Sequence, residues 1–108
     1  MITTSQECRY PKGRPYQATT ESIPYIVDTT EWTETPSSPL VGSVIDETSG
    51  TDVKTTVMPS GSPTVSGVEI TLPLLTALTL GRQYRVEVTF SGPNSAVFAC
   101  HLRVICNS

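Results

Sequence analysis

The chain has 108 residues, a net charge of −3 and three cysteines. This length is enough for one domain that buries a core without needing disulfides. Ser and Thr together account for 29 residues, and nine Pro and seven Gly interrupt the chain. This composition favours short strands joined by turns over helices. The acidic balance argues against a nucleic-acid groove, which needs a clustered basic face.

Residues 1–22 are expected to form an extended N-terminal arm. They show no hydrophobic periodicity and few aliphatic side chains, so the segment cannot bury itself. It carries a charge of +1, whereas residues 23–108 carry −4. Pro residues next to its aromatic side chains keep the backbone extended, so that rings and guanidinium groups can contact a neighbour. The candidate partner-binding residues are Arg9, Tyr10, Lys12, Arg14 and Tyr16.

Residues 23–108 are expected to form an all-β domain, an immunoglobulin-like sandwich of about seven short strands. Apolar or alternating runs are separated by Pro-, Gly- and Ser-rich turns roughly every 8–12 residues, which is typical of this class. Pro24 places the first run at a sheet edge, and Ser66-Gly67 indicates a tight hairpin. The expected strands lie at residues 23–27, 40–45, 53–58, 65, 68–72, 84–90 and 96–105.

The most specific structural signal lies in residues 78–90. A Leu-x-x-Gly turn leads into strict alternation of apolar and polar side chains, which indicates a strand with one buried and one solvated face. A Tyr just after a Gly turn has the arrangement of a tyrosine corner, in which the phenol bonds to upstream backbone. We therefore expect Leu80, Gly81 and Tyr84 to form such a corner, with the Tyr84 hydroxyl bonded within residues 74–80.

The three cysteines are expected to be reduced thiols. Cys100 and Cys106 lie six residues apart on one predicted strand, about 20 Å at ~3.3 Å per residue, which is beyond the reach of a disulfide. Cys8 lies in the arm, and an odd number of cysteines is a poor disulfide framework.

The sequence singles out no catalytic, cofactor-binding or metal-binding residue. His101 is the only histidine, and no particular nucleophile and orienting acid accompany it, as general base catalysis requires. Together with Cys100 and Cys106 it superficially resembles a metal cluster. Neighbours on a strand point to opposite faces, however, whereas Zn²⁺ needs converging ligands. An acidic stretch is typical of a polar turn and lacks the spacing of a calcium loop; it contains Asp46, Glu47 and Asp52.

Targeting signals are not apparent either. The residues after Met1 are polar and do not form a secretory leader, and no window approaches the ~18 apolar residues of a membrane span. These features predict a protein that is made and kept in a cytoplasm.

Four motifs stand between residues 43 and 105: Gly50-Thr51-Asp52-Val53, Val65-Ser66-Gly67, Ile70-Thr71-Leu72-Pro73 and Leu78-Thr79-Leu80-Gly81-x-x-Tyr84-Arg85-Val86-Glu87-Val88-x-Phe90. Through these motifs, residues 43–105 resemble small tailed-bacteriophage virion proteins with an immunoglobulin-like body. This region is about 60% of the chain. The resemblance implies a non-enzymatic structural part of the head or neck, located in the virion and assembled in the host bacterial cytoplasm.

The first functional hypothesis is a capsid decoration, or cement, protein. It would bind the major capsid protein or neighbouring virion subunits through the arm and a sheet edge, with contacts between copies and with no nucleic-acid or membrane partner. Weak contacts repeated over a shell sum to a large stabilisation. One alternative is a head–tail connector or neck subunit, present in few copies. Another is a displayed module that binds a carbohydrate or host surface, for which the body offers chiefly Trp32 and Tyr25 as aromatic platforms.

Overall fold

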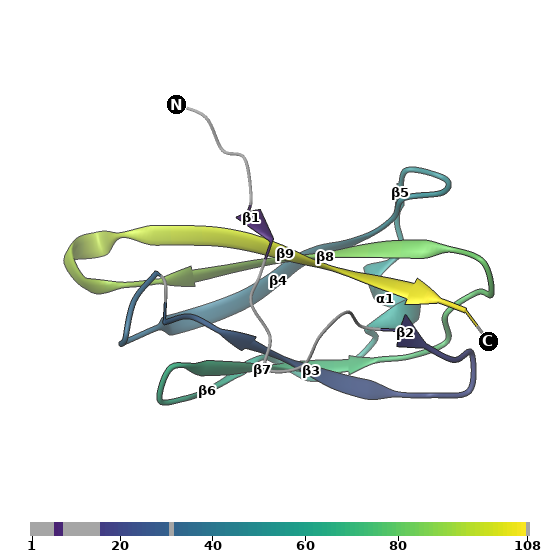
Figure 1. The fold of residues 1–108 in the computed structure, drawn as a ribbon. Helices are drawn as coiled ribbons and strands as arrows, with labels where there is room; N and C mark the ends of the chain where they lie inside the picture. Colours follow the sequence, from purple (N-terminus) through teal and green to yellow (C-terminus); the bar gives the residue numbers. More distant parts are fainter. Residues whose placement is uncertain (1–5, 8–15, 31, 108) are drawn as a thin grey trace.

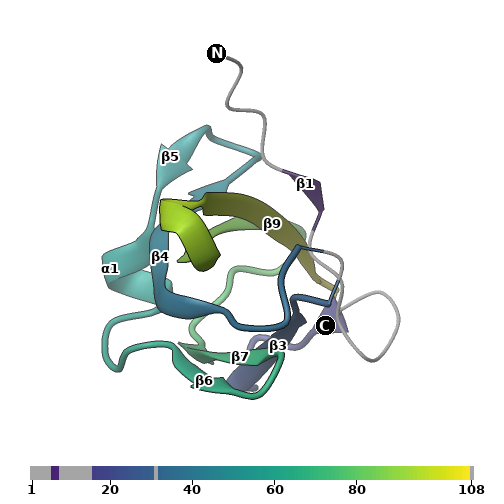
Figure 2. The same cartoon turned by 90° about the vertical axis from the view of Figure 1, so that its left-hand side faces the viewer.

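The computed structural model describes residues 6–7, 16–30 and 32–107, which form two β-sheets packed face to face (Figures 1 and 2). The larger sheet has the strand order β1-β9-β8-β4-β5, with β2 also paired to β9, and the smaller sheet has the order β3-β7-β6. The elements are β1 (Gln6–Glu7), β2 (Tyr16–Gln17), β3 (Ile23–Asp28), β4 (Ser37–Asp46), β5 (Thr51–Asp52), α1 (Lys54–Val57), β6 (Thr64–Ser66), β7 (Glu69–Leu75), β8 (Gln83–Ser91), the 3₁₀ turn η1 (Pro93–Ser95) and β9 (Val97–Cys106).

This grouping of strands is that of an immunoglobulin-like sandwich. In such sandwiches the first, second, fifth and fourth strands form one sheet, and the third, sixth and seventh form the other. Here β3, β7 and β6 make the first set, and β4, β8 and β9 make the second. The first strand of that pattern has no counterpart in the smaller sheet as described, since β1 and β2 pair with β9 instead. The end-on view of Figure 2 shows the two layers facing each other. The predicted all-β sandwich is therefore confirmed.

The core follows from alternation on the long strands. Along β8 every second side chain is buried, and β9 repeats the pattern in antiparallel register with it. The opposite layer contributes the inward side chains of β3 and β7, and the residues around α1 close one side. Burial of these apolar surfaces is the main stabilising term of the fold. The fully buried core side chains include Val27, Val44, Ile70, Leu75, Val86, Val88, Cys100, Leu102 and Val104.

The expected tyrosine corner is present. Tyr84 is 2% exposed, and its hydroxyl accepts a hydrogen bond of 2.8 Å from the Thr79 backbone N–H, within the predicted segment. Gly81 has φ +85°, a left-handed conformation that favours glycine, and its N–H donates to the Cys106 carbonyl at 2.9 Å. Leu80 is 61% exposed, whereas Leu78 is buried. The corner therefore ties the β7–β8 connection to the sandwich through Tyr84.

Replacing Tyr84 by phenylalanine should lower the free energy of unfolding by about 1–2 kcal/mol. The ring and its burial are kept, but the Thr79 N–H loses its acceptor, and an unpaired polar group costs free energy. Urea denaturation followed by fluorescence of Trp32 measures the change. A midpoint equal to that of the wild type would show that the corner hydrogen bond does not stabilise the sandwich.

The prediction of a strand at residues 53–58 was wrong. The chain forms the short helix α1 there, with Val57 and Met58 buried and Val53 packed against the core. These apolar residues are four and five positions apart, so a single helical turn brings them to one side. The same segment carries the chain from β5 in the larger sheet to β6 in the smaller one.

Several predicted strands are longer than expected, and β4 among them is irregular. β7 continues to Leu75, and β4 begins at Ser37, within a stretch expected to be a Pro/Ser-rich connection. The register of β4 against β8 shifts between Ser37 and Leu40, where Ser38 has φ +49°. Because Pro39 has no N–H to donate, the ladder is interrupted at this point rather than ended.

Candidate functional site

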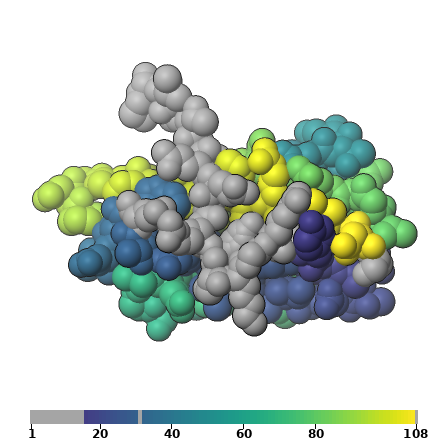
Figure 3. Space-filling view, in the orientation of Figure 1, coloured from purple at the N-terminus to yellow at the C-terminus, as the bar shows by residue number. Residues whose placement is uncertain are grey.

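Tyr16 is the only one of the five candidate partner-binding residues that the structure describes. Arg9, Tyr10, Lys12 and Arg14 lie outside the described residues. Tyr16 begins β2 and is 46% exposed, while its backbone pairs in parallel with Ile105 of β9. In Figure 3 the dark purple atoms of this segment lie against the yellow C-terminal end of β9.

The described parts of the N-terminal segment pair with their own chain. Gln6 and Glu7 lie opposite Cys100 and His101, and the next paired segment, β2, lies further along the same strand. The expectation that the whole of residues 1–22 crosses to a neighbour is therefore corrected for β1 and β2. The physical reason is that β9 would otherwise leave an open edge, and a segment of the same chain fills it at high effective concentration.

Gln17 is the buried anchor of this arrangement, and the sequence reasoning missed it. Its side chain is 0% exposed. Nε2 donates to the Leu75 carbonyl at 2.6 Å and to the Glu21 carbonyl at 2.9 Å, and Oε1 accepts from the Tyr25 hydroxyl at 3.0 Å. A buried amide is stable only with such partners. Its preceding neighbour Tyr16 pairs with Ile105 of the larger sheet, so β2 links the two sheets.

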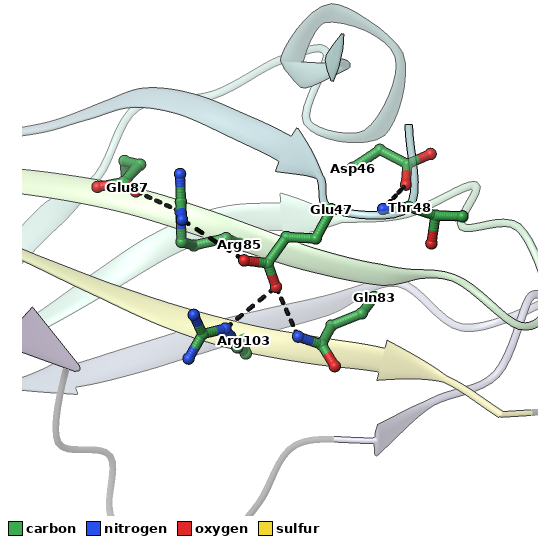
Figure 4. A network of polar contacts seen from close by, with 7 residues as sticks. All are labelled: Asp46, Glu47, Thr48, Gln83, Arg85, Glu87 and Arg103. Carbon is green, nitrogen blue, oxygen red and sulfur yellow. Dashed lines mark hydrogen bonds and ion pairs between the residues drawn. The ribbon is translucent and has the colours of Figure 1, made fainter. Parts of the chain in front are cut away.

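A network of charged side chains covers one end of the outer face of the larger sheet (Figure 4). Glu47 follows β4, and its Oε1 accepts from Gln83 Nε2 at 2.5 Å and from Arg103 Nε at 3.0 Å. Its Oε2 lies 3.5 Å from Arg85 Nη1, and Arg85 Nε lies 2.6 Å from Glu87 Oε2. Arg85 and Arg103 are direct cross-strand neighbours. Two like charges in that position repel, so Glu47 offsets an otherwise unfavourable pair.

The turn after β4 uses its carboxylates for structure. Asp46 is 4% exposed, its Oδ1 accepts from the Thr48 N–H at 2.9 Å, and its Oδ2 lies 2.5 Å from Arg82 Nη1. Asp52 Oδ1 accepts from the Lys54 N–H at 3.0 Å. Backbone and guanidinium donors thus occupy these oxygens, as in the predicted polar turn. Across the described residues, no three His, Cys, Asp or Glu side chains are grouped to hold a metal ion.

These contacts lower the pKa values of the Glu47 and Asp46 carboxyl groups. Burial raises the pKa of the Glu47 carboxyl, but hydrogen bonds from Gln83 and Arg103 and the charges of Arg103 and Arg85 outweigh it, so the net pKa is lowered. The pKa of Asp46 is also lowered, because hydrogen bonds from Arg82 and the turn backbone outweigh its burial. Both groups are therefore held ionised in the fold.

The fold should lose stability in acid through these carboxylates. Because their folded pKa values lie below the unfolded ones, the stabilisation is complete above about pH 4–5 and is lost as the pH falls through the lower, folded values. Glu47→Gln should lower the free energy of unfolding at pH 7 by about 1–2 kcal/mol and should flatten its fall in acid. Urea midpoints between pH 2.5 and 7 measure both effects. An acid profile identical to that of the wild type would exclude Glu47 as a contributor.

The prediction of three reduced thiols was wrong for Cys100, which is disulfide-bonded. Cys106 is a buried thiol, and Cys8 lies outside the described residues. The sequence geometry excluded only the pair on one strand, Cys100 and Cys106, and the expectation for Cys8 rested on its place in the arm and on the odd number of cysteines. The tertiary structure lays β1 beside β9 at Cys100, and sequence distance along one strand does not reveal such a neighbour.

At the other end of the same outer face, the described residues include a group of five uncharged side chains. Leu40 lies opposite Thr89, and Thr89 lies opposite Ala99, while Val97 lies opposite Ser91 in the next row. Leu40 is 57% exposed and Val97 72% exposed. We call these five residues the neutral face. The sequence signal was present, because all five belong to predicted strands or their ends, but only the register brings them together.

The aromatic side chains proposed as a carbohydrate platform pack inward instead. Trp32 and Tyr25 both lie against the core. The Trp32 ring meets Phe90 edge-on, with 6.0 Å between ring centroids, and the Tyr25 hydroxyl bonds to Gln17. Both side chains are therefore only partly exposed.

Comparisons with protein-family models, with curated proteins and with solved structures find no match to this chain. Among the described residues, the helices are too short and too polar to cross a membrane.

Proposed function

We propose that this chain is a non-enzymatic structural subunit that docks onto a larger protein assembly, most specifically a capsid decoration or cement protein of a tailed bacteriophage. The main evidence for a docking surface is the neutral face. Exposed apolar side chains surrounded by hydroxyl groups, with a charged network at one end, match the apolar centre and polar rim of a protein interface. The assignment to a virion rests on the resemblance of residues 43–105.

Three further observations support this proposal. The N-terminal candidates are basic and aromatic, whereas the body is acidic, so the arm and a neighbouring body are complementary in charge. The disulfide at Cys100 suits a protein that functions outside a reducing cytoplasm, for which a virion surface is one place. The inward packing of Trp32 and Tyr25 favours protein docking over the carbohydrate-binding alternative. A neck subunit remains the second candidate within the same class.

The test is incorporation into particles. The doubly substituted variant Leu40→Lys with Val97→Lys should fold as the wild type does, because both positions are exposed, but it should be lost from purified particles. Leu74→Lys is the matched control, since Leu74 is 50% exposed on the opposite sheet, and it should incorporate fully. Quantitative mass spectrometry against the major capsid protein gives the occupancy.

The outcomes separate the parts of the proposal. Full incorporation of the double variant would show that the neutral face is not the docking surface. Absence of the wild-type chain from particles would exclude a virion role. A few wild-type copies per particle would favour the neck subunit over the decoration protein, which is expected in many copies.

A further inference from the structure

The disulfide of Cys100 lies inside the sandwich. Cys100 belongs to the inward row of β9 and is 0% exposed. Its partner is not Cys106, which is a buried thiol on the same strand. The sequence contains one further cysteine, Cys8, which directly follows β1 and is outside the described residues.

β1 and β2 cover the same edge of β9 at two places. The N–H and C=O of Cys106 pair with Arg82 and Gly81, on the side of β8. Backbone groups alternate in direction along a strand, so those of His101 and Ile105 point to the opposite side. β1 lies there beside His101, and β2 lies beside Ile105.

β1 and β2 differ in the contacts that attach them to the sandwich. β2 contains Gln17, whose buried side chain hydrogen-bonds to the other sheet. β1 has only two residues, and so short a ladder cannot offset the conformational entropy of the chain that it orders. It pairs with β9 at Cys100 itself, which places the covalent bond where β1 needs an anchor.

We propose that the Cys100 disulfide is a covalent latch that holds β1 on β9 and closes this part of the sheet edge. A dithiol opens the latch: it gives two electrons and two protons to the disulfide, leaves two protein thiols and becomes a cyclic disulfide. Because Cys100 is buried, the dithiol reaches it only after local opening. An opened edge exposes backbone groups to strands of other chains, so oxidation protects the protein against edge-to-edge association.

Amide hydrogen exchange on the full chain, followed by NMR, tests the latch. The comparison uses the oxidised protein, the protein equilibrated with dithiothreitol, and Cys100→Ala. Exchange of the His101 N–H should rise at least about tenfold when the disulfide is absent, while that of Ile105 should change less than about twofold, because β2 keeps its own anchor. Cys106→Ala is the matched control: it removes another buried cysteine of the same strand but leaves the disulfide, and the His101 N–H should stay protected.

Other results would overturn the proposal. One is an unchanged exchange rate of the His101 N–H in the reduced protein. The other is an equal increase in the exchange rates of the His101 and Ile105 N–H groups, which would mean a global loss of stability. Cys8→Ala, the one remaining cysteine of the sequence, should reproduce the pattern of Cys100→Ala and serves as a second variant. A Cys8→Ala protein with the exchange pattern of the oxidised wild type would contradict the latch as well. The unfolded wild type should show one reactive thiol before reduction and all three cysteines afterwards.

Discussion

Replacing Phe90 by alanine should lower the free energy of unfolding by about 3–5 kcal/mol, the largest effect expected of any single truncation in this chain. Phe90 is 1% exposed at the end of β8. Its ring centroid lies 5.6 Å from that of Phe98 and 6.0 Å from that of Trp32. Alanine would remove the apolar burial and both ring contacts, and it would leave a cavity between the sheets.

The size of this effect can be judged against the whole domain. A domain of this length has a stability of about 5–15 kcal/mol, so the variant should melt at least about 10 °C lower. Val97→Ala, on the same hairpin but 72% exposed, should change the stability by less than about 0.5 kcal/mol. Thermal and urea denaturation measure both variants. Similar stabilities for Phe90→Ala and Val97→Ala would mean that the ring contacts of Phe90 do not contribute to the packing between the sheets.

Gln17→Met should lower the free energy of unfolding by about 2–4 kcal/mol. Methionine has a similar length and shape, so the change isolates the hydrogen bonds of the amide from its volume. The carbonyls of Leu75 and Glu21 lose a donor, and the Tyr25 hydroxyl loses its acceptor. Unpaired groups at a buried site cost more than the net value of the bonds they had made.

Tyr25→Phe is the matched control for Gln17→Met. It removes the hydroxyl that bonds to Gln17 and should lower the stability by about 0.5–1.5 kcal/mol. If the two variants are equally stable, the bonds from Gln17 to the smaller sheet do not contribute. A further check is the Ile105 N–H, which should exchange faster in Gln17→Met, because β2 then loses its side-chain anchor.

The N-terminal arm and the buried Gln17 belong to the same segment, residues 1–22. A deletion of residues 1–22 removes β1, β2 and this buried side chain together, so a failure of that truncated chain to assemble would have two explanations. Substitution of Arg9, Lys12 and Arg14 by glutamine leaves both strands in place. This variant tests the charge complementarity of the arm without disturbing the sandwich.

The parts that could be predicted are those decided by local pattern. The alternation along β8 placed Val86 and Val88 inside, and the Gly turn before Tyr84 predicted the corner whose hydroxyl contact is now seen. Pro24 predicted that β3 is an edge strand of its sheet, as it is. In each case neighbouring residues alone supply the physical cause.

The parts that could not be predicted depend on pairs distant in the sequence. Glu47 contacts Arg103, 56 positions away, and Gln17 contacts Leu75, 58 positions away. In the sequence, Gln17 reads as one more polar residue of an aperiodic segment. The helix α1 was missed because Val53, Val57 and Met58 turn toward a core whose position depends on both sheets.

By itself, the sequence determined the class of fold, the inward faces of the long strands and the tyrosine corner, because period-two alternation and turn chemistry act between close neighbours. Only the tertiary structure decided that β1 and β2 lie on β9, that Cys100 enters a disulfide and that Leu40 and Val97 share one neutral face. These features follow from strand register and sheet packing, which bring together residues that no local pattern relates.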